Sequence, residues 1–467
     1  MGVVTYQLTP GELGQFVLTQ VYASIAVGAV NFGLLVGYER NFFIYEKSTR
    51  KSAQLISSAL FFVLTNLLIL LFIVHLYQIE ISKLLLSNDA PINLLFIVLI
   101  ATSISSLSQY YLTFFKNSGL AKRYVQFMIF QTGCYFTVAI LLLFLSNLKV
   151  LSLAYAMLIS NALTFIFLIM ALSKRLPPIF NKEMLKDMLK ISLPLTPRVF
   201  FGLLSTQFDK IMLGFIGSTE LVGIYSVGQK FSSTIYQFMN GLGRVFQPEL
   251  YRKLFANKHQ AKTDEINNFI MPYFYLSIFI ALLVAIFAKE FMSILLANEY
   301  YQASIITSIL SIYYASFFFG KIVGNQLIYA KKTFIISFLT LGGIFLNVVL
   351  NIPFIIKWGV YGAAWATTIA SILTTYITYI VAQRYVKIIW QWRPIWLIYI
   401  VFIFGVVFTL IDSSSLIKMN IYMSLIAKFI FIFIFIALGF KLNILTKARA
   451  QDFKVFLFTK ARIQKFM

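Results

Sequence analysis

The chain has 467 residues, of which 60% are hydrophobic and only 12% are charged, whereas a soluble protein is close to a quarter charged. The mean hydropathy of +0.84 and the shortness of every polar stretch indicate a polytopic membrane protein without a soluble domain. The formal net charge is +23, but no basic soluble domain exists to hold a nucleic acid, so none is expected as a partner. One cysteine, Cys134, excludes an internal disulfide, and two histidines are too few for a histidine-built metal site.

A helix needs about 20 apolar residues to cross the hydrocarbon core of a bilayer. In chain order, this requirement predicts thirteen membrane-spanning helices, so the expected fold is all-α. The predicted helices cover residues 14–37, 55–77, 92–115, 124–146, 151–172, 191–216, 221–246, 268–288, 302–329, 334–356, 361–383, 395–411 and 420–440.

The segments that connect the predicted helices lie alternately on the two sides of the membrane, and their Lys and Arg content alternates too. One side comprises the segment after the first helix, every second segment from there and the C-terminal tail, and it holds 28 of the 39 Lys and Arg residues. The segments on the opposite side hold 5. Because these residues collect in cytoplasmic loops, we expect an outward N-terminus and a cytoplasmic C-terminus. The remaining six lie inside predicted helices.

Three pairs of short segments repeat at offsets of 208 to 210 residues. ISKLLLSNDAPINLL after Glu80 resembles FMSILLANEYYQASI after Glu290, and Gly14 in GELGQF matches Gly223 in TELVGIY. An Ala-Lys pair at 121 matches one at 330. Both copies have the same orientation, which predicts a parallel repeat about the membrane normal.

The predicted helix over 191–216 has no counterpart in the first copy, because that counterpart would begin before residue 1. We therefore expect an ancestral design of fourteen helices whose first helix is missing from this chain, through a misassigned start or a genuine truncation. A protein that naturally has thirteen helices is the alternative.

Ionisable side chains inside membrane helices are costly and commonly face a hydrated cavity or one another. Residues 191–329 carry five such cations and one acid, Asp209, and Lys428 is a sixth cation in the last predicted helix. Asp209 lies eleven residues after Arg198 and shares its helix face. Lys230, Gln237 and Arg244 are seven residues apart and form a second polar stripe, with Ser233 and Asn240 beside it. We expect a water-filled chamber with a cationic wall, suited to an anion, lined by Arg198, Lys210, Lys230, Gln237, Arg244 and Lys321.

Structural explanations compete with this interpretation. Arg198 and Arg244 lie near helix ends, where a long side chain can reach lipid phosphates, and Asp209 and Lys210 could neutralise each other. Lys428, in the last helix, is expected to be peripheral, so its replacement by alanine should have little effect.

Two prolines precede the charged part of the helix over 191–216. Pro194 and Pro197 are expected to mark the start of that helix and a bend there, since proline is tolerated in a first helical turn.

Two long stretches resemble a known family. ISLPLTPRVFFGLLSTQFDKIMLGFIGSTELVGIYSVGQKFSSTIYQFMNG and KWGVYGAAWATTIASILTTYITYIVAQRY are similar to the Wzx-like polysaccharide biosynthesis (O-antigen) flippases, a branch of the multidrug/oligosaccharidyl-lipid/polysaccharide exporter superfamily. The resemblance covers nearly the whole chain. Its most specific parts are the Asp-Lys before MLG, the segment ELVGIYSV and the segment GVYGAAWAT.

The resemblance implies two six-helix lobes around a central cavity, followed by two extra helices. On this chain the N-terminal lobe would cover 1–190 with five visible helices, and the C-terminal lobe 191–394. The extra helices would lie in 395–440, before a basic cytoplasmic tail over 441–467.

The resemblance also implies a function without catalysis. Such proteins move undecaprenyl-diphosphate-linked oligosaccharides from the cytoplasmic to the periplasmic leaflet of the bacterial inner membrane, by alternating access. The substrate would be the lipid-linked oligosaccharide, and a polysaccharide polymerase and chain-length proteins would be further partners. A cationic wall would attract the diphosphate.

No cofactor is expected, and no P-loop is present to bind ATP. The family allows proton or sodium coupling, for which Asp209 is the first candidate carboxylate. Glu39 beside Arg40 is the second candidate for coupling or gating, and a simple surface ion pair explains those two residues equally well.

Three other functions remain open. A multidrug cation antiporter of the same superfamily is disfavoured by the cationic helices. A flippase for a lipid-linked peptidoglycan precursor shares the chemistry. A glycan polymerase or ligase would be an enzyme with a large periplasmic loop, whereas the longest outward loop expected here has about 14 residues.

Overall fold

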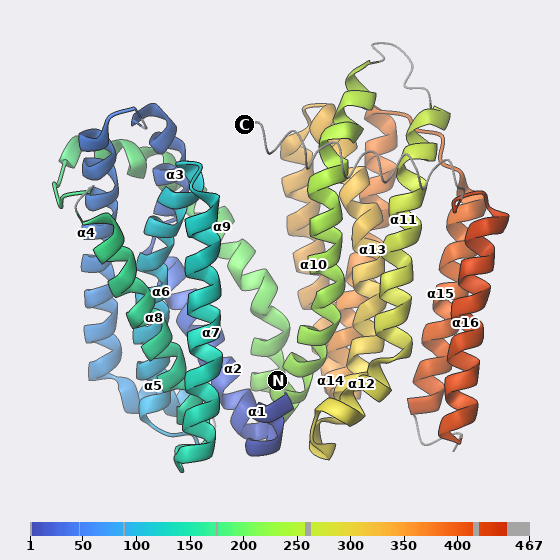
Figure 1. The fold of residues 1–467 in the computed structure, drawn as a ribbon, viewed down its shortest axis with the longest axis horizontal. Coiled ribbons are helices and arrows are strands. Elements are labelled where there is room, and N and C mark those ends of the chain that lie inside the picture. Colours follow the sequence, from blue (N-terminus) through green and yellow to red (C-terminus); the bar gives the residue numbers. More distant parts are fainter. Residues whose placement is uncertain are drawn as a thin grey trace. The chain divides into compact units, whose positions relative to one another are not determined.

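The computed structural model describes residues 2–45, 47–86, 89–173, 176–256, 263–413 and 420–445. Within these ranges the elements are helices and no strand occurs (Figure 1). Eleven helices of the described residues are long and apolar enough to cross a membrane. The all-α, multi-pass fold is therefore confirmed, and the count of thirteen helices stays a prediction.

The chain forms two compact units, Met1–Ser226 and Val227–Met467. The first unit contains α1 (Gly2–Gln7), α2 (Pro10–Val30), α3 (Leu34–Tyr45), α4 (Thr49–Leu76), α5 (Gln78–Leu85), α6 (Asn93–Asn117), α7 (Ala121–Leu145), α8 (Val150–Leu172), α9 (Lys182–Ile216) and the first turns of α10 (Thr219–Ala256). The second contains the rest of α10, α11 (Thr263–Ile286), α12 (Ala288–Leu295), η1 (Asn298–Tyr300), α13 (Ala303–Tyr329), α14 (Thr333–Tyr385), α15 (Trp392–Ser413) and α16 (Ile421–Lys441).

The predicted helix over 14–37 is two helices in the structure. A capping box at Thr9 and Glu12 starts α2 four residues earlier than predicted. The chain then leaves the helical conformation at Phe32 and Gly33, which both have positive φ, before α3 begins. Hydropathy extends through this break, so the sequence pattern did not reveal it.

The helix that carries the two prolines starts earlier than predicted. Asn181 caps α9 by accepting from the backbone N–H of Met184, so Pro194 and Pro197 lie inside the helix and do not mark its start. The helix packs against α2, α3 and α4 within the first unit. The Thr196 hydroxyl donates to the Phe32 carbonyl oxygen at 2.8 Å, which ties α9 to the break between α2 and α3.

One helical element contains two predicted spans. In α14 the backbone turns at Gly359, with φ of 54° and ψ of −129°. This separates the predicted helices over 334–356 and 361–383. A Cβ atom at Gly362 would lie 1.9 Å from the carbonyl oxygen of Phe354, so only glycine permits the return of the chain there.

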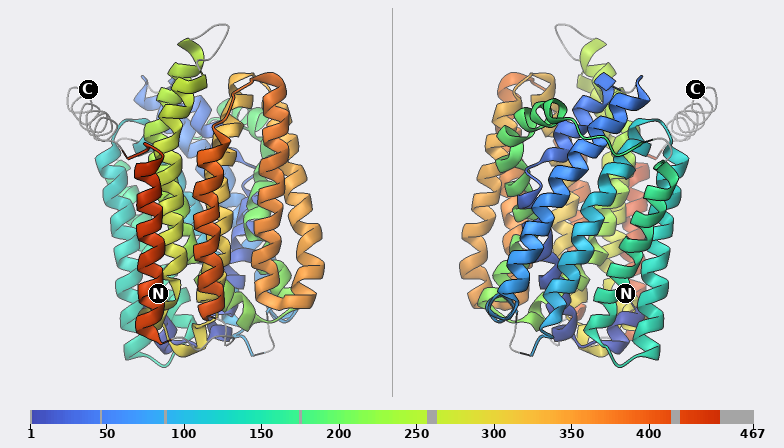
Figure 2. Two further views of the ribbon diagram at one scale, coloured as in Figure 1. Left: turned by 90° about the vertical axis from the view of Figure 1, so that its right-hand side faces the viewer. Right: turned by 90° about the vertical axis from the view of Figure 1, so that its left-hand side faces the viewer.

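The helix bounds follow the predicted repeat. α4 ends at Leu76 and is followed by the eight-residue helix α5, and α11 ends 210 residues later and is followed by the eight-residue helix α12. In the second unit only, two further helices follow, and α15 and α16 pack against each other and against α11 (Figure 2).

Candidate functional site

Asp209 is buried in the first unit, although it lies in a predicted membrane helix. Its side chain is carried by α9, and the residue is 8% exposed. The Tyr225 hydroxyl of α10 donates to its Oδ2 at 2.7 Å. This tyrosine was not singled out from the sequence, and its hydrogen bond helps to orient the carboxylate.

The cations on α9 have different surroundings. The Lys210 ammonium donates to the Gln207 side-chain oxygen at 3.1 Å, one helical turn earlier. Arg198 lies on the same helix, and its side chain is outside the described part of the structure. Asp209 thus accepts from a tyrosine of α10, and Lys210 donates to a glutamine of its own helix.

Glu39 forms an ion pair with Lys116, which α6 supplies, and Arg40 donates to the Asn41 side chain at 3.3 Å. The Glu39 and Lys116 side chains are 40% and 50% exposed. The partner of Glu39 therefore comes from another helix, and the pair lies at the surface.

In the second unit, Lys321 on α13 lies against α10. Its ammonium donates to the Asn240 side-chain oxygen at 3.2 Å. A Cβ atom at Gly243 would lie 2.7 Å from the same nitrogen, so the glycine leaves room for the lysine head. The structure thus brings Lys321 to Asn240, which lies beside the polar stripe of α10.

The other predicted site residues lie along α10. Lys230 and Gln237 are both exposed within the second unit. Arg244 is in the helical part of α10, and nothing is described of its side chain. In the described residues, no group of three His, Cys, Asp or Glu side chains is arranged to hold a metal.

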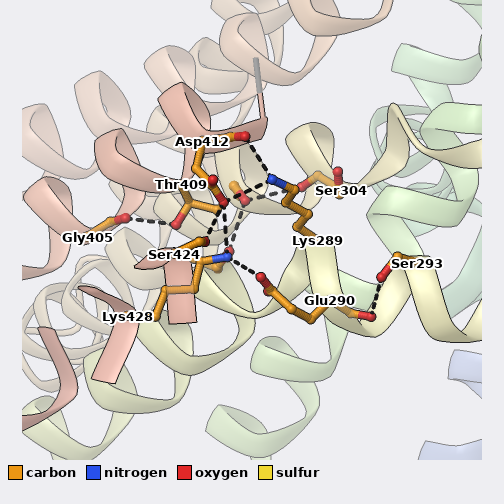
Figure 3. Close-up of polar contacts among 11 residues, drawn as sticks. Lys289, Glu290, Ser293, Ser304, Gly405, Thr409, Asp412, Ser424 and Lys428 are labelled. Atoms are coloured by element: carbon orange, nitrogen blue, oxygen red, sulfur yellow. Dashed lines mark hydrogen bonds and ion pairs between the residues drawn. The ribbon is translucent and has the colours of Figure 1, made fainter. Parts of the chain in front are cut away.

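Lys428 is not peripheral, so the prediction that it lies at the edge of the protein is wrong. Its side chain has no exposed surface, and it forms ion pairs with Glu290 and with Asp412. Lys289 also pairs with Asp412, at 3.1 Å. We call Lys289, Glu290, Asp412 and Lys428 the charge quartet; Figure 3 shows how their side chains converge from α12, α15 and α16.

The Asp412 carboxylate is the centre of the charge quartet. Its Oδ2 atom lies 3.2 Å from the Lys428 ammonium and accepts from the Ser424 hydroxyl at 2.9 Å. The Lys289 ammonium also donates to the Asp412 carbonyl oxygen at 2.9 Å. Two cations and two anions leave the quartet with no net charge.

Sequence reasoning missed the quartet because the predicted helix over 395–411 stops one residue before Asp412. A signal was nevertheless present. Asp412 is the only acidic residue between Glu299 and Asp452, and Lys428 lies inside an otherwise apolar helix, so the two are natural partners.

Solved structures share this fold. The lipid II flippase MurJ, in an inward closed conformation, matches with a TM-score of 0.70 and 15% identity over 95% of this chain and 96% of that chain. An inward-facing multidrug resistance transporter of the MATE family, from the MOP superfamily, matches with a TM-score of 0.60 and 15% identity over 82% and 92%. At such identities the likeness shows the fold alone.

Sequence comparison identifies one curated relative and a protein family. A probable low-salt glycan biosynthesis flippase of Haloferax volcanii, Agl15, is 24% identical over 225 residues, which are 47% of this chain and 48% of that protein. The chain thus spans about half the length of this relative. The family described as polysaccharide biosynthesis protein matches residues 3–254, more than half of the chain. The chain therefore belongs to the polysaccharide biosynthesis protein family.

Proposed function

We propose that this protein is a flippase that moves undecaprenyl-diphosphate-linked oligosaccharide repeat units from the cytoplasmic to the periplasmic leaflet of a bacterial inner membrane. Membership of the polysaccharide biosynthesis family supports a glycan substrate. The fold that it shares with MurJ and a MATE transporter supports alternating access, in which no covalent bond is made or broken.

Lys321 and its surroundings carry the proposal of an anionic substrate. The lysine donates to the neutral amide of Asn240, and neither α13 nor α14 contains an acidic residue. A lysine inside a membrane helix commonly faces a hydrated cavity, where its positive charge can bind an anion. A diphosphate fits this requirement, and a cationic drug does not.

The distribution of Lys and Arg supports a cytoplasmic C-terminus, since 28 of them lie on one side of the predicted helices and 5 on the other. A proton or sodium gradient would supply the energy, with no bound cofactor. Asp209 would be the coupling carboxylate, because it is buried and oriented by Tyr225. A glycan polymerase and chain-length proteins would act on the product.

The first experiment measures surface glycan in a strain that lacks its own polysaccharide flippase and expresses this protein. Restored display is expected for the wild type and for Lys441→Ala, whose exposed lysine ends α16. Display should fall for Lys230→Ala and Lys321→Ala while the amount of membrane protein is unchanged.

Two further strains separate the alternatives. One is depleted of its peptidoglycan precursor flippase, and the other lacks its multidrug exporters. Rescue of growth in the first strain without glycan display would contradict the proposed substrate. Export of a cationic dye by the second strain, without glycan display in any host, would contradict an anionic substrate altogether.

A further inference from the structure

The charge quartet joins two parts of the second unit. Lys289 and Glu290 lie in the first turn of α12, which continues α11, whereas Asp412 and Lys428 belong to the α15–α16 hairpin. The Lys289–Asp412 and Glu290–Lys428 ion pairs cross from α12 to the hairpin, and the Asp412–Lys428 pair joins the two helices of the hairpin. The quartet is therefore at the joint where the hairpin meets the unit.

The first repeat provides an internal comparison. At the offset of 210 residues, Glu80 of α5 corresponds to Glu290, and Ile79 corresponds to Lys289. Glu80 is exposed, and no hairpin follows in that repeat. Lys289 thus occurs only in the copy that carries the hairpin.

The apolar surface next to the quartet also differs between the repeat that carries the hairpin and the repeat that does not. In α4, Leu68, Phe72 and Leu76 are 57%, 64% and 58% exposed. Their counterparts on α11 at the same offset, which are Ile278, Leu282 and Ile286, have no exposed surface. A Cβ atom at Gly405 of α15 would lie 2.7 Å from Leu282. The hairpin therefore covers a stripe that the first repeat leaves open.

Apolar contacts alone do not fix the register of this hairpin along the helices on which it packs. Lipid tails are as apolar as the side chains of α16, so burial in a membrane provides no hydrophobic force between helices. Residues Phe429 to Ile436 alternate Phe and Ile without interruption. A slide of α16 by one turn, about 5.4 Å, would exchange similar apolar contacts but would separate Lys428 from both of its acidic partners.

We propose that the charge quartet is an electrostatic lock that sets the register in which the α15–α16 hairpin docks on α11 and α12. Lys428 is its central element because it is fully buried and pairs with an acid from each side of the joint. Removing one member of a buried charge cluster leaves an uncompensated charge, whereas removing an oppositely charged pair does not.

The test uses the full-length protein in lipid nanodiscs and needs no transport assay. Spin labels on Ser293→Cys in α12 and Lys441→Cys at the end of α16, with Cys134→Ser, report the register as a distance distribution. Both label positions are exposed. Thermal unfolding of the unlabelled proteins reports stability. The matched control is Glu80→Gln, the equivalent acid of the first repeat.

For Lys428→Met we expect a distance distribution that is broadened or shifted by about 5 Å and a Tm lowered by about 5 °C or more. The net-neutral double variant Glu290→Gln/Lys428→Met should recover most of the Tm but keep the altered distances. Glu80→Gln should match the wild type in both measurements.

Three results would overturn the lock. A wild-type distance distribution in Lys428→Met would show that apolar packing sets the register. Full recovery of the distances in the double variant would show that charge balance alone matters. A Tm that stays low in the double variant would assign the loss to packing of the lysine stem. If Lys428→Met does not accumulate, the double variant carries the test, because it has no uncompensated charge.

Discussion

Gly14 and Gly223 lie in direct backbone contact and are equivalent residues of the repeat. A Cβ atom at Gly14 would fall 1.7 Å from the carbonyl oxygen of Thr219, and one at Gly223 would fall 2.0 Å from that of Pro10. Pro10 and Thr219 begin α2 and α10 and are themselves related by the same offset of 209 residues. Within the first unit, α2 and the first turns of α10 thus meet through a reciprocal contact that only glycine permits.

This contact predicts that Gly14→Ala and Gly223→Ala each destabilise the protein. The added methyl group overlaps a backbone oxygen that cannot move aside as a side chain would, and overpacking of this kind costs about 1–3 kcal/mol. Thermal unfolding in detergent should show a clearly lower Tm for both variants.

Gly133→Ala is the matched control for the glycine variants. Gly133 lies inside α7, and nothing is within 4 Å of the position of its Cβ atom. Alanine favours a helix over glycine by about 1 kcal/mol, so this variant should equal or exceed the wild type. An equal loss for all three variants would contradict the special role of the contact.

Asn240→Asp should inhibit transport because it places a carboxylate beside the Lys321 ammonium, where the amide oxygen now lies at 3.2 Å. The new carboxylate would compete with an anionic substrate. A charged hydrogen bond contributes about 1.5–3 kcal/mol, so we expect a loss of about tenfold or more in glycan display. Asn240→Gln keeps the amide and should retain more display than Asn240→Asp; the reverse order would contradict an anionic ligand.

Asp209→Asn should remove the response of transport to an ion gradient while leaving the fold intact, because asparagine can still accept from Tyr225. Uptake into proteoliposomes would be compared with and without an imposed proton or sodium gradient. Tyr225→Phe keeps the carboxylate and should remain gradient-dependent. A gradient response that survives in Asp209→Asn would exclude this residue as the coupling group.

Glu39→Gln is expected to change the free energy of unfolding by less than about 1 kcal/mol, since exposed ion pairs contribute little and this pair is 40% and 50% exposed. The same assay of gradient response decides between a surface pair and a second coupling site. A selective loss of the gradient response would favour coupling.

Hydropathy located the helices because the cost of placing a residue in lipid depends mainly on that residue and its neighbours along the chain. α4 contains all but the last residue of the predicted span over 55–77, and α16 contains all but the first residue of the predicted span over 420–440. Hydropathy did not reveal helix breaks and helix starts that are set by backbone conformation and capping. The positive φ at Phe32 and Gly33 divides an apolar stretch, and the cap at Asn181 starts α9 before its prolines.

The sequence by itself determined the all-helical membrane fold, the repeat and the identity of the charged residues inside helices. It did not determine the partners of those residues. Lys428 is 138 residues from Glu290, and whether such a lysine is buried or reaches the membrane surface depends on which helix packs beside it. Only the tertiary structure decides that, because electrostatic pairing acts across space, whereas insertion into lipid is decided along the chain.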